Sequence, residues 1–171
     1  MLLDTDNQAD VVLLYQQIKQ CKTTLKQLLT TAEESQSTKL EAQPVQDYFD
    51  NVLARWQLMR PLLQTRIQFT NSSAVSAVFH PTIAQSILNL LNNAADASER
   101  VNIDLSWNTE MATISIRDFG AGLDTDKMKM LGQPFVTDKA DGLGLGLFLS
   151  QATLTRFDGT VSLQNAPEGG T

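Results

Sequence analysis

Two asparagines four residues apart interrupt an otherwise apolar segment of the chain. They are Asn89 and Asn93, in the stretch NLLNNA at positions 89–94. Four residues make about one helical turn, so in a helix both side chains would lie on one face. Because the amide oxygen of asparagine is a hard neutral ligand, this face could hold Mg²⁺. The plainer interpretation is that both asparagines only face solvent.

The segment DFGAG at positions 118–122 joins a carboxylate to two glycines. Asp118 follows an alternating apolar stretch that predicts a strand, so its carboxylate would lie at a strand end. There it can accept a hydrogen bond from an exocyclic amine such as that of adenine. Gly120 and Gly122 would let the backbone turn tightly and approach a ligand. Alone, this segment is also typical of an ordinary Asp-Gly loop.

The segment PFVTDK at positions 134–139 is a polar loop that carries one aromatic ring. Phe135 could act there as an apolar latch over a ligand. Lys139 is a mobile point charge that could reach a phosphate. In isolation, the segment is more typical of an exposed surface loop.

The segment GLGLGL at positions 142–147 opens a predicted helix. Successive backbone N–H groups that no side chain shields form an anion cradle at a helix N-terminus. The spacing GxGxG without a surrounding βαβ unit is not a Rossmann fingerprint. No Gly-Lys-Ser/Thr follows, so the segment is not a Walker loop either.

Apolar periodicity predicts the elements that must position these four segments. Spacings of three and four residues predict helices over 44–59, 80–97 and 145–156. Alternation predicts strands near 66–70 and over 101–107, 111–118 and 160–164. The short polar link at 108–110 predicts a hairpin between the second and third of these strands.

The first part of the chain carries a different pattern. Apolar residues recur at alternating spacings of three and four: Val11, Leu14, Ile18, Cys21, Leu25 and Leu28. This is a heptad seam on a helix. The seam predicts a helical region at 1–31. The polar residues that follow predict a linker at 32–43, and the mixed helix and strand patterns beyond it predict a domain at 44–171. A seam of this length could also pack on the chain's own domain.

Composition excludes several classes of function. The net charge of −6 argues against non-specific nucleic-acid binding, which depends on Lys and Arg. No apolar run reaches the roughly 18 residues of a membrane span, and the first residues do not resemble a signal peptide. The single cysteine, Cys21, can form neither an internal disulfide nor a CxxC metal site, which fits the reducing cytoplasm.

Taken in order, the four segments resemble the N box, the first glycine box, the F box and the second glycine box of sensor histidine kinases. The resemblance implies an α+β fold, a two-layer α/β sandwich in which helices cover one face of a mixed sheet. ATP would lie beneath a flexible lid. Residues 1–31 would be the second helix of a dimerisation hairpin that precedes the ATP-binding catalytic domain.

The resemblance also implies a role for each residue of the N box and the lid. Asn93 would bind the Mg²⁺ that bridges the ATP phosphates. Asn89, one turn earlier, would line the same pocket. Asn89 and Lys139 are the residues expected to act in the catalytic step.

The other expected ATP contacts lie in the two glycine boxes and the lid. Asp118 would read adenine, with Gly120 and Gly122 flanking the base. The remaining contacts implied by the resemblance are Phe135, Thr137, Lys139, Gly142, Leu143, Gly144, Leu145 and Gly146.

Asn89 distinguishes the histidine kinases from the related gyrase, Hsp90 and MutL ATPases. The gyrase-like enzymes place a glutamate there as a general base, whereas an asparagine cannot take up a proton at neutral pH. Transfer of the γ-phosphate to a histidine is therefore the leading hypothesis. The alternatives are a nucleotide-binding regulatory module and a hydrolytic ATPase. A pure interaction domain built on the heptad seam would leave the four segments unexplained.

A histidine kinase needs a phosphoacceptor histidine on its dimerisation helix. The only histidine, His80, opens the predicted helix 80–97 and is expected to be a helix cap or a surface residue. We therefore expect no autophosphorylation of this chain. The resemblance places the acceptor helix, the homodimer contacts and any membrane contact in an upstream region, and implies a cognate response regulator as partner. The chain stops at Gly-Gly-Thr, where a further strand is expected.

The region around Cys21 resembles the RegB-type redox-responsive kinases. In that subfamily, a cysteine at this place in the second helix is linked to redox control. Lys19 and Lys22 lie beside Cys21 in the sequence. The alternative is that Cys21 serves as a small apolar seam residue.

Overall fold

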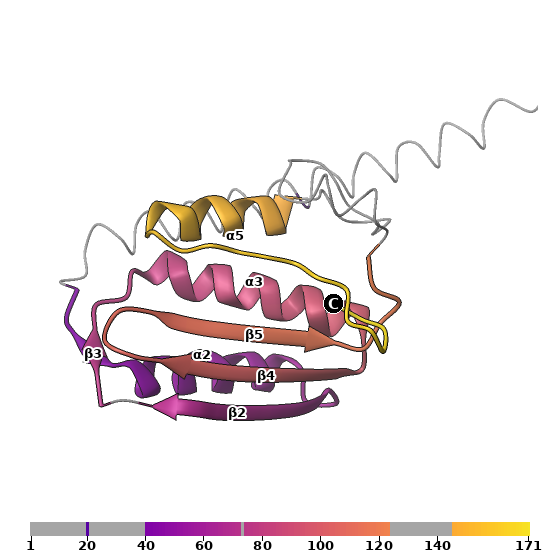
Figure 1. Ribbon diagram of the computed structural model, residues 1–171, viewed down its shortest axis with the longest axis horizontal. Coiled ribbons are helices and arrows are strands. Elements are labelled where there is room, and N and C mark those ends of the chain that lie inside the picture. The colour runs from indigo at the N-terminus through magenta and orange to yellow at the C-terminus, as the bar shows by residue number, and fades with distance from the viewer. Residues whose placement is uncertain (1–19, 21–39, 73, 124–144) are drawn as a thin grey trace, which may run out of the picture.

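The computed structural model describes residue 20 and residues 40–72, 74–123 and 145–171. Its elements follow one another as β1 (Gln43–Pro44), α2 (Val45–Met59), β2 (Gln64–Ser72), β3 (Ser76–Ala77), α3 (Pro81–Ala97), β4 (Arg100–Trp107), β5 (Ala112–Asp118) and α5 (Leu145–Arg156). Figure 1 shows α2, α3 and α5 layered with the sheet, and α5 lying along α3. The predicted α+β fold, with helices against a mixed sheet, is confirmed.

The main sheet has the strand order β2-β4-β5. β2 is parallel to β4, and β4 is antiparallel to β5. The predicted hairpin joins β4 to β5, and Asn108 shapes its turn because its Oδ1 accepts the backbone N–H groups of Glu110 and Met111, both at 2.8 Å. A second, two-stranded pair of β1 and β3 ties the start of α2 to the segment before α3.

The core lies between the inner face of β4 and the apolar faces of α2 and α3. Alternate residues of β4 are buried, as the period of two requires: Val101, Ile103, Leu105 and Trp107. Trp56 of α2 and Leu91 of α3 are fully buried against them. The intervening β4 residues face outward, so the sheet has one apolar and one polar face.

α3 begins and ends where the sequence predicts. His80 is its N-cap, and the backbone N–H of Thr82 donates to His80 Nδ1 at 3.4 Å. Pro81 follows at the first helical position, where its missing N–H costs nothing. The helix ends at Ala97, and Ser98 is extended. The capping role predicted for His80 is confirmed.

The predicted strand at 160–164 is wrong, since these residues form no strand in the structure. A strand is held by ladder hydrogen bonds to a neighbour. At the end of β5, the backbone N–H of Asp118 donates to Thr171 O at 2.9 Å, so the chain that reaches this edge is residue 171 and not 160–164. Alternating apolar residues are therefore not sufficient for a strand without an adjacent partner.

Several predictions lie outside the described residues. They are the heptad seam at 11–28, the regulatory residue Cys21, most of the linker at 32–43, and the lid and glycine residues Phe135, Thr137, Lys139, Gly142, Leu143 and Gly144. Within the described ranges, no helix is both long and apolar enough to cross a membrane.

Candidate functional site

The ends of two helices and one strand that carry residues of the predicted site lie at the same end of the domain. Figure 1 shows the last turns of α3, the end of β5 and the start of α5 together on that side. α3 and α5 run in opposite directions, and Ser150 Oγ donates to Ser86 O at 3.3 Å where they pack. Moving from this contact toward the start of α5 therefore leads along α3 toward Asn89 and Asn93.

Asp118 is the buried carboxylate of this end of the domain. Its side chain is only 7% exposed, and its Oδ1 accepts the backbone N–H of Gly120 at 2.9 Å. No other group among the described residues donates to this carboxylate. Asp118 therefore keeps acceptor capacity for a ligand donor such as an amine.

Gly120 brings the end of β5 against the last turn of α3. A Cβ atom placed on Gly120 would lie 2.5 Å from the carbonyl oxygen of Ala97, a distance that real side chains do not show. Asn93 is one turn before Ala97, which is about 6 Å along the helix axis. The structure thus places Asn93 and Asp118 toward the same end of the domain, and their joint role in binding a ligand stays a prediction.

Asn89 is half-buried on α3 and is oriented by a neighbour. Gln85 Nε2 donates to Asn89 Oδ1 at 3.1 Å. Asn93, one turn further along α3, is exposed to solvent. Both asparagines follow Ser86 on the side of α3 that α5 covers.

Asp96 forms an ion pair with a residue that follows α2. Its Oδ1 lies 2.7 Å from Nη2 of Arg60, at the end of α2. Both side chains are about one third exposed, so this ion pair contributes little to stability, roughly 0–1 kcal/mol.

α5 starts at Leu145 with Gly146 in its first turn. The first N–H groups of a helix have no intrahelical partner and favour an anion. A Cβ atom on Gly146 would meet nothing within 4 Å, so no neighbour among the described residues requires glycine there. A ligand approaching the helix end closely would require it.

Asn165 belongs to this region, although it lies outside the four segments that predict the site. Its Oδ1 accepts the N–H of Leu123 at 2.8 Å, and its Nδ2 donates to Leu123 O at 2.6 Å. The same amide lies against Gly122, which has a φ of 76°. The turn-forming run NAPEGG at 165–170 is the sequence signal that could have drawn attention to it.

The donor set around Asn93 limits how a metal could be held. Within the ranges described, no three His, Cys, Asp or Glu side chains gather as a metal site. A Mg²⁺ ion at Asn93 would therefore need oxygen ligands from bound phosphates, which is how Mg²⁺ is commonly held with nucleotides. The residues present fit that arrangement, because α3 carries an amide oxygen at Asn93 and α5 begins at the same end of the domain with free N–H groups.

More than half of the chain matches a known protein family. Residues 80–171 match the family described as histidine kinase-, DNA gyrase B- and HSP90-like ATPases. The matched range contains α3, β4, β5 and α5, and with them every described residue of the candidate site.

Individual relatives are sensor kinases. The chain is 30% identical over 121 residues to the sensor protein DegM of Bacillus sp. (strain B21-2), covering 67% of this chain and 32% of that protein. It is 37% identical over 89 residues to the signal transduction histidine-protein kinase AtoS of Escherichia coli (strain K12), covering 50% of this chain and 15% of AtoS. The chain thus spans less than a third of the length of either relative.

A solved structure shares the fold. The catalytic domain of the histidine kinase ThkA superposes with a TM-score of 0.66 at 18% identity, covering 78% of this chain and 91% of that one.

Proposed function

The chain belongs to the family of histidine kinase-, DNA gyrase B- and HSP90-like ATPases, as a sensor histidine kinase catalytic domain, and from that premise we propose that it binds ATP with Mg²⁺ and donates the γ-phosphate to a histidine on another segment. The observation that supports this proposal is that the last turns of α3, the end of β5 and the start of α5 lie at one end of the domain, and that these elements carry Asn93, Asp118 and Gly146. These groups complement a Mg²⁺-bound phosphate chain, a base amine and an anion, respectively.

Asp118 selects the base. Its carboxylate is fixed by the N–H of Gly120 and accepts the exocyclic amine of adenine with its remaining lone pairs. Guanine carries a carbonyl oxygen at the corresponding ring position. Two acceptors would then face each other at a buried site, which is unfavourable because neither is satisfied.

The phosphates lie between α3 and the first turn of α5. Mg²⁺, when bound, neutralises phosphate charge and fixes the geometry of the phosphate chain. Asn93 offers its amide oxygen to the ion, while the first N–H groups of α5 face the phosphates. Lys139 is proposed to contribute a further positive charge from the lid. Phe135, Thr137, Gly142, Leu143 and Gly144 are proposed to complete the nucleotide contacts.

Asn89 favours transfer over hydrolysis. Gln85 holds its amide in one orientation, and an amide cannot accept a proton from water at neutral pH. No residue at this position then activates water to attack the γ-phosphate. The nucleotide is therefore preserved for a histidine acceptor.

The partners follow from this role and remain proposals. We place the acceptor histidine on a dimerisation helix of the same kinase, in a homodimer, with a response regulator as the final acceptor. The domain would work in the cytoplasm, a reducing compartment that suits a chain with the single cysteine Cys21. A redox role for Cys21, as in the RegB-type kinases, belongs to the same proposal.

Calorimetric titration with a non-hydrolysable ATP analogue tests the nucleotide site. We expect binding that requires Mg²⁺ and is far weaker for the GTP analogue. Asn93→Ala should remove the Mg²⁺ dependence, whereas Asn92→Ala, the same change on another face of α3, should not. Equal binding of both nucleotides, or equal effects of the two variants, would refute the assignment.

Transfer itself needs a separate acceptor. The chain mixed with radiolabelled ATP and an isolated acceptor-helix domain should label that domain and not itself. Labelling of His80 would contradict its role as a helix cap.

A further inference from the structure

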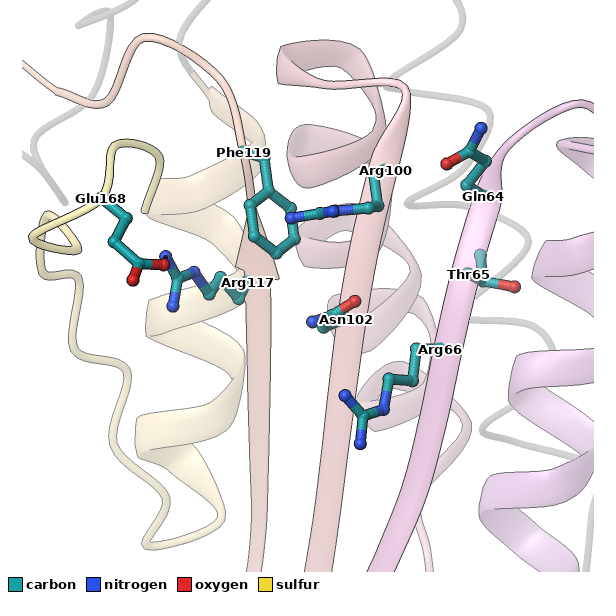
Figure 2. Close-up of a pocket in the computed structure, with 8 residues that line it drawn as sticks. All are labelled: Gln64, Thr65, Arg66, Arg100, Asn102, Arg117, Phe119 and Glu168. Carbon is teal, nitrogen blue, oxygen red and sulfur yellow. Dashed lines mark hydrogen bonds and ion pairs between the residues drawn. The ribbon is translucent and has the colours of Figure 1, made fainter.

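An open hollow lies on the face of the sheet turned away from the helices. Its volume is about 470 Å³. Figure 2 looks onto this face, with the helices behind the strands. We call it the outer-face hollow and define it by the residues Arg66, Arg100, Asn102, Arg117, Phe119 and Glu168. The candidate nucleotide site does not include it, since Asp118 is buried on the other side of β5.

Strand register places polar groups of the hollow in one row. Arg66 of β2 pairs with Asn102 of β4, and Asn102 pairs with Arg117 of β5. Neighbouring strands lie about 4.8 Å apart, so the two arginines start about 10 Å apart with the amide between them. Arg100 is two residues before Asn102 on β4 and therefore shares its face.

The ring of Phe119 stacks on the guanidinium group of Arg100. The Cζ atom of Arg100 lies 3.4 Å from the centre of the Phe119 ring, and that of Arg117 lies 4.9 Å from it. Figure 2 shows the Arg100 side chain reaching from β4 to this ring. A guanidinium stacked on a ring keeps its N–H donors in a fixed plane, where they can point at a ligand.

The positive charge of the hollow is only partly compensated. Beside the hollow, the side-chain amide of Gln68 bridges Arg66 and the carboxylate of Asp104, at 3.0 and 3.1 Å. Three guanidinium groups line it, and the one carboxylate among its lining residues is that of Glu168. The Glu168 side chain is 83% exposed, and its Oε2 is 3.5 Å from Arg117 Nη2, which makes a weak bridge. Arg117 Nε is buried without a hydrogen-bond partner. This local excess occurs in a chain whose net charge is −6.

We propose that the outer-face hollow binds a small oxyanion with at least two negative charges. Planar guanidinium forks match phosphate and carboxylate oxygens, and Asn102 supplies a neutral donor between them. Such a ligand replaces the weak Glu168 contact at Nη2 of Arg117. Phosphate esters and di- or tricarboxylates share this chemistry, and the experiment separates them.

Titration with pyrophosphate and with citrate, at constant ionic strength and without Mg²⁺, tests the proposal. Binding is followed by calorimetry and by the arginine Nε–Hε signals in ¹H–¹⁵N spectra. At least one probe should bind and shift the Arg117 signal. Binding of pyrophosphate alone would assign the site to phosphates, and binding of citrate alone to carboxylates. No shift with either probe up to about 10 mM would overturn the proposal.

Charge-matched variants give the control. Arg100→Gln should weaken binding about tenfold, because a charged hydrogen-bonding group is lost. Arg55→Gln removes the same charge from the exposed surface of α2 and should change little. Equal losses in both variants would mean unspecific attraction.

A second variant separates this site from the nucleotide site. Asn93→Ala should leave oxyanion binding intact. Loss of pyrophosphate binding in Asn93→Ala, with retention in Arg100→Gln, would place the anion at the nucleotide site and overturn the proposal.

Discussion

Gly170 lies directly against the backbone of Asp118, so closely that a Cβ atom on Gly170 would collide with the Asp118 carbonyl oxygen. Gly170 also has a φ of 81°, a conformation that side chains disfavour. The next residue, Thr171, accepts the backbone N–H of Asp118 at 2.9 Å. The backbone of Asp118, whose carboxylate we propose to select the base, is thus held by a segment more than fifty residues away in the sequence.

Gly170→Ala should destabilise the domain and weaken ATP binding together. The left-handed conformation costs a non-glycine residue about 1–2 kcal/mol, and the collision with Asp118 adds to it. Chemical denaturation and analogue titration measure the two effects. Wild-type stability in this variant would show that the close contact is not present in solution.

Gly146→Ala provides the opposite case. Nothing lies within 4 Å of a Cβ atom at this position, and alanine is the better helix former by about 1 kcal/mol. We expect unchanged or higher stability with weaker nucleotide binding, because the methyl group enters the proposed phosphate cradle. A variant that binds the ATP analogue normally would exclude Gly146 from the cradle.

Asp118→Asn should reduce discrimination between adenine and guanine nucleotides. The loss of a hydrogen bond to a charged acceptor corresponds to about 1.5–3 kcal/mol, or roughly ten- to a hundredfold in affinity for the ATP analogue. Asp104→Asn on the outer face of β4 is the control and should bind as the parent does. Unaltered selectivity in Asp118→Asn would assign base reading to another residue.

Asn165→Ala should loosen the chain at Leu123. Two hydrogen bonds, at 2.8 and 2.6 Å, are lost, which corresponds to about 1–3 kcal/mol locally. Hydrogen exchange at the Leu123 amide should accelerate. Gln164→Ala, a change at the neighbouring exposed residue, should not alter this exchange rate. Equal exchange rates in the two variants would argue against the two hydrogen bonds between Asn165 and Leu123.

Tyr48→Phe should leave the domain as stable or more stable. Tyr48 Oη is buried without a hydrogen-bond partner, while its ring stacks on Phe79 at 3.7 Å and would be retained as phenylalanine. Removal of an unsatisfied buried hydroxyl is neutral or favourable by up to about 1–3 kcal/mol. Denaturation curves at neutral pH test this, and a loss of more than 1 kcal/mol would indicate a partner for the hydroxyl.

The same variant has a signature at alkaline pH. Burial raises the pKa of Tyr48 above its ordinary value of about 10. Below pH 10 the phenol is neutral in both folded and unfolded states, so this pKa shift does not change the free energy of unfolding with pH. Above pH 10 the unfolded state releases the proton more readily, and wild-type stability falls. The advantage of Tyr48→Phe should therefore grow as the pH rises above 10.

Much of the domain could be read from local signals in the sequence. His80 and Pro81 predicted the start of α3, because capping and the first helical position depend only on neighbouring residues. The alternation from Val101 to Trp107 predicted both β4 and its buried face. For the same reason, the sequence placed Asn89 and Asn93 on one helix and Asp118 at a strand end, while their role in nucleotide binding stays a prediction.

What the sequence by itself determined, then, is the family, the fold class and most of the helices and strands. Tertiary structure decided which distant segments support them. The strand expected at 160–164 failed because ladder bonds come from a partner that no local pattern specifies. Two kinds of contact depend on the tertiary structure in this way. The C-terminal segment packs back on the domain, which joins Gly170 to Asp118 and Asn165 to Leu123. Strand register forms the row of Arg66, Asn102 and Arg117. These follow from packing across the sheet, which spacing along the chain does not encode.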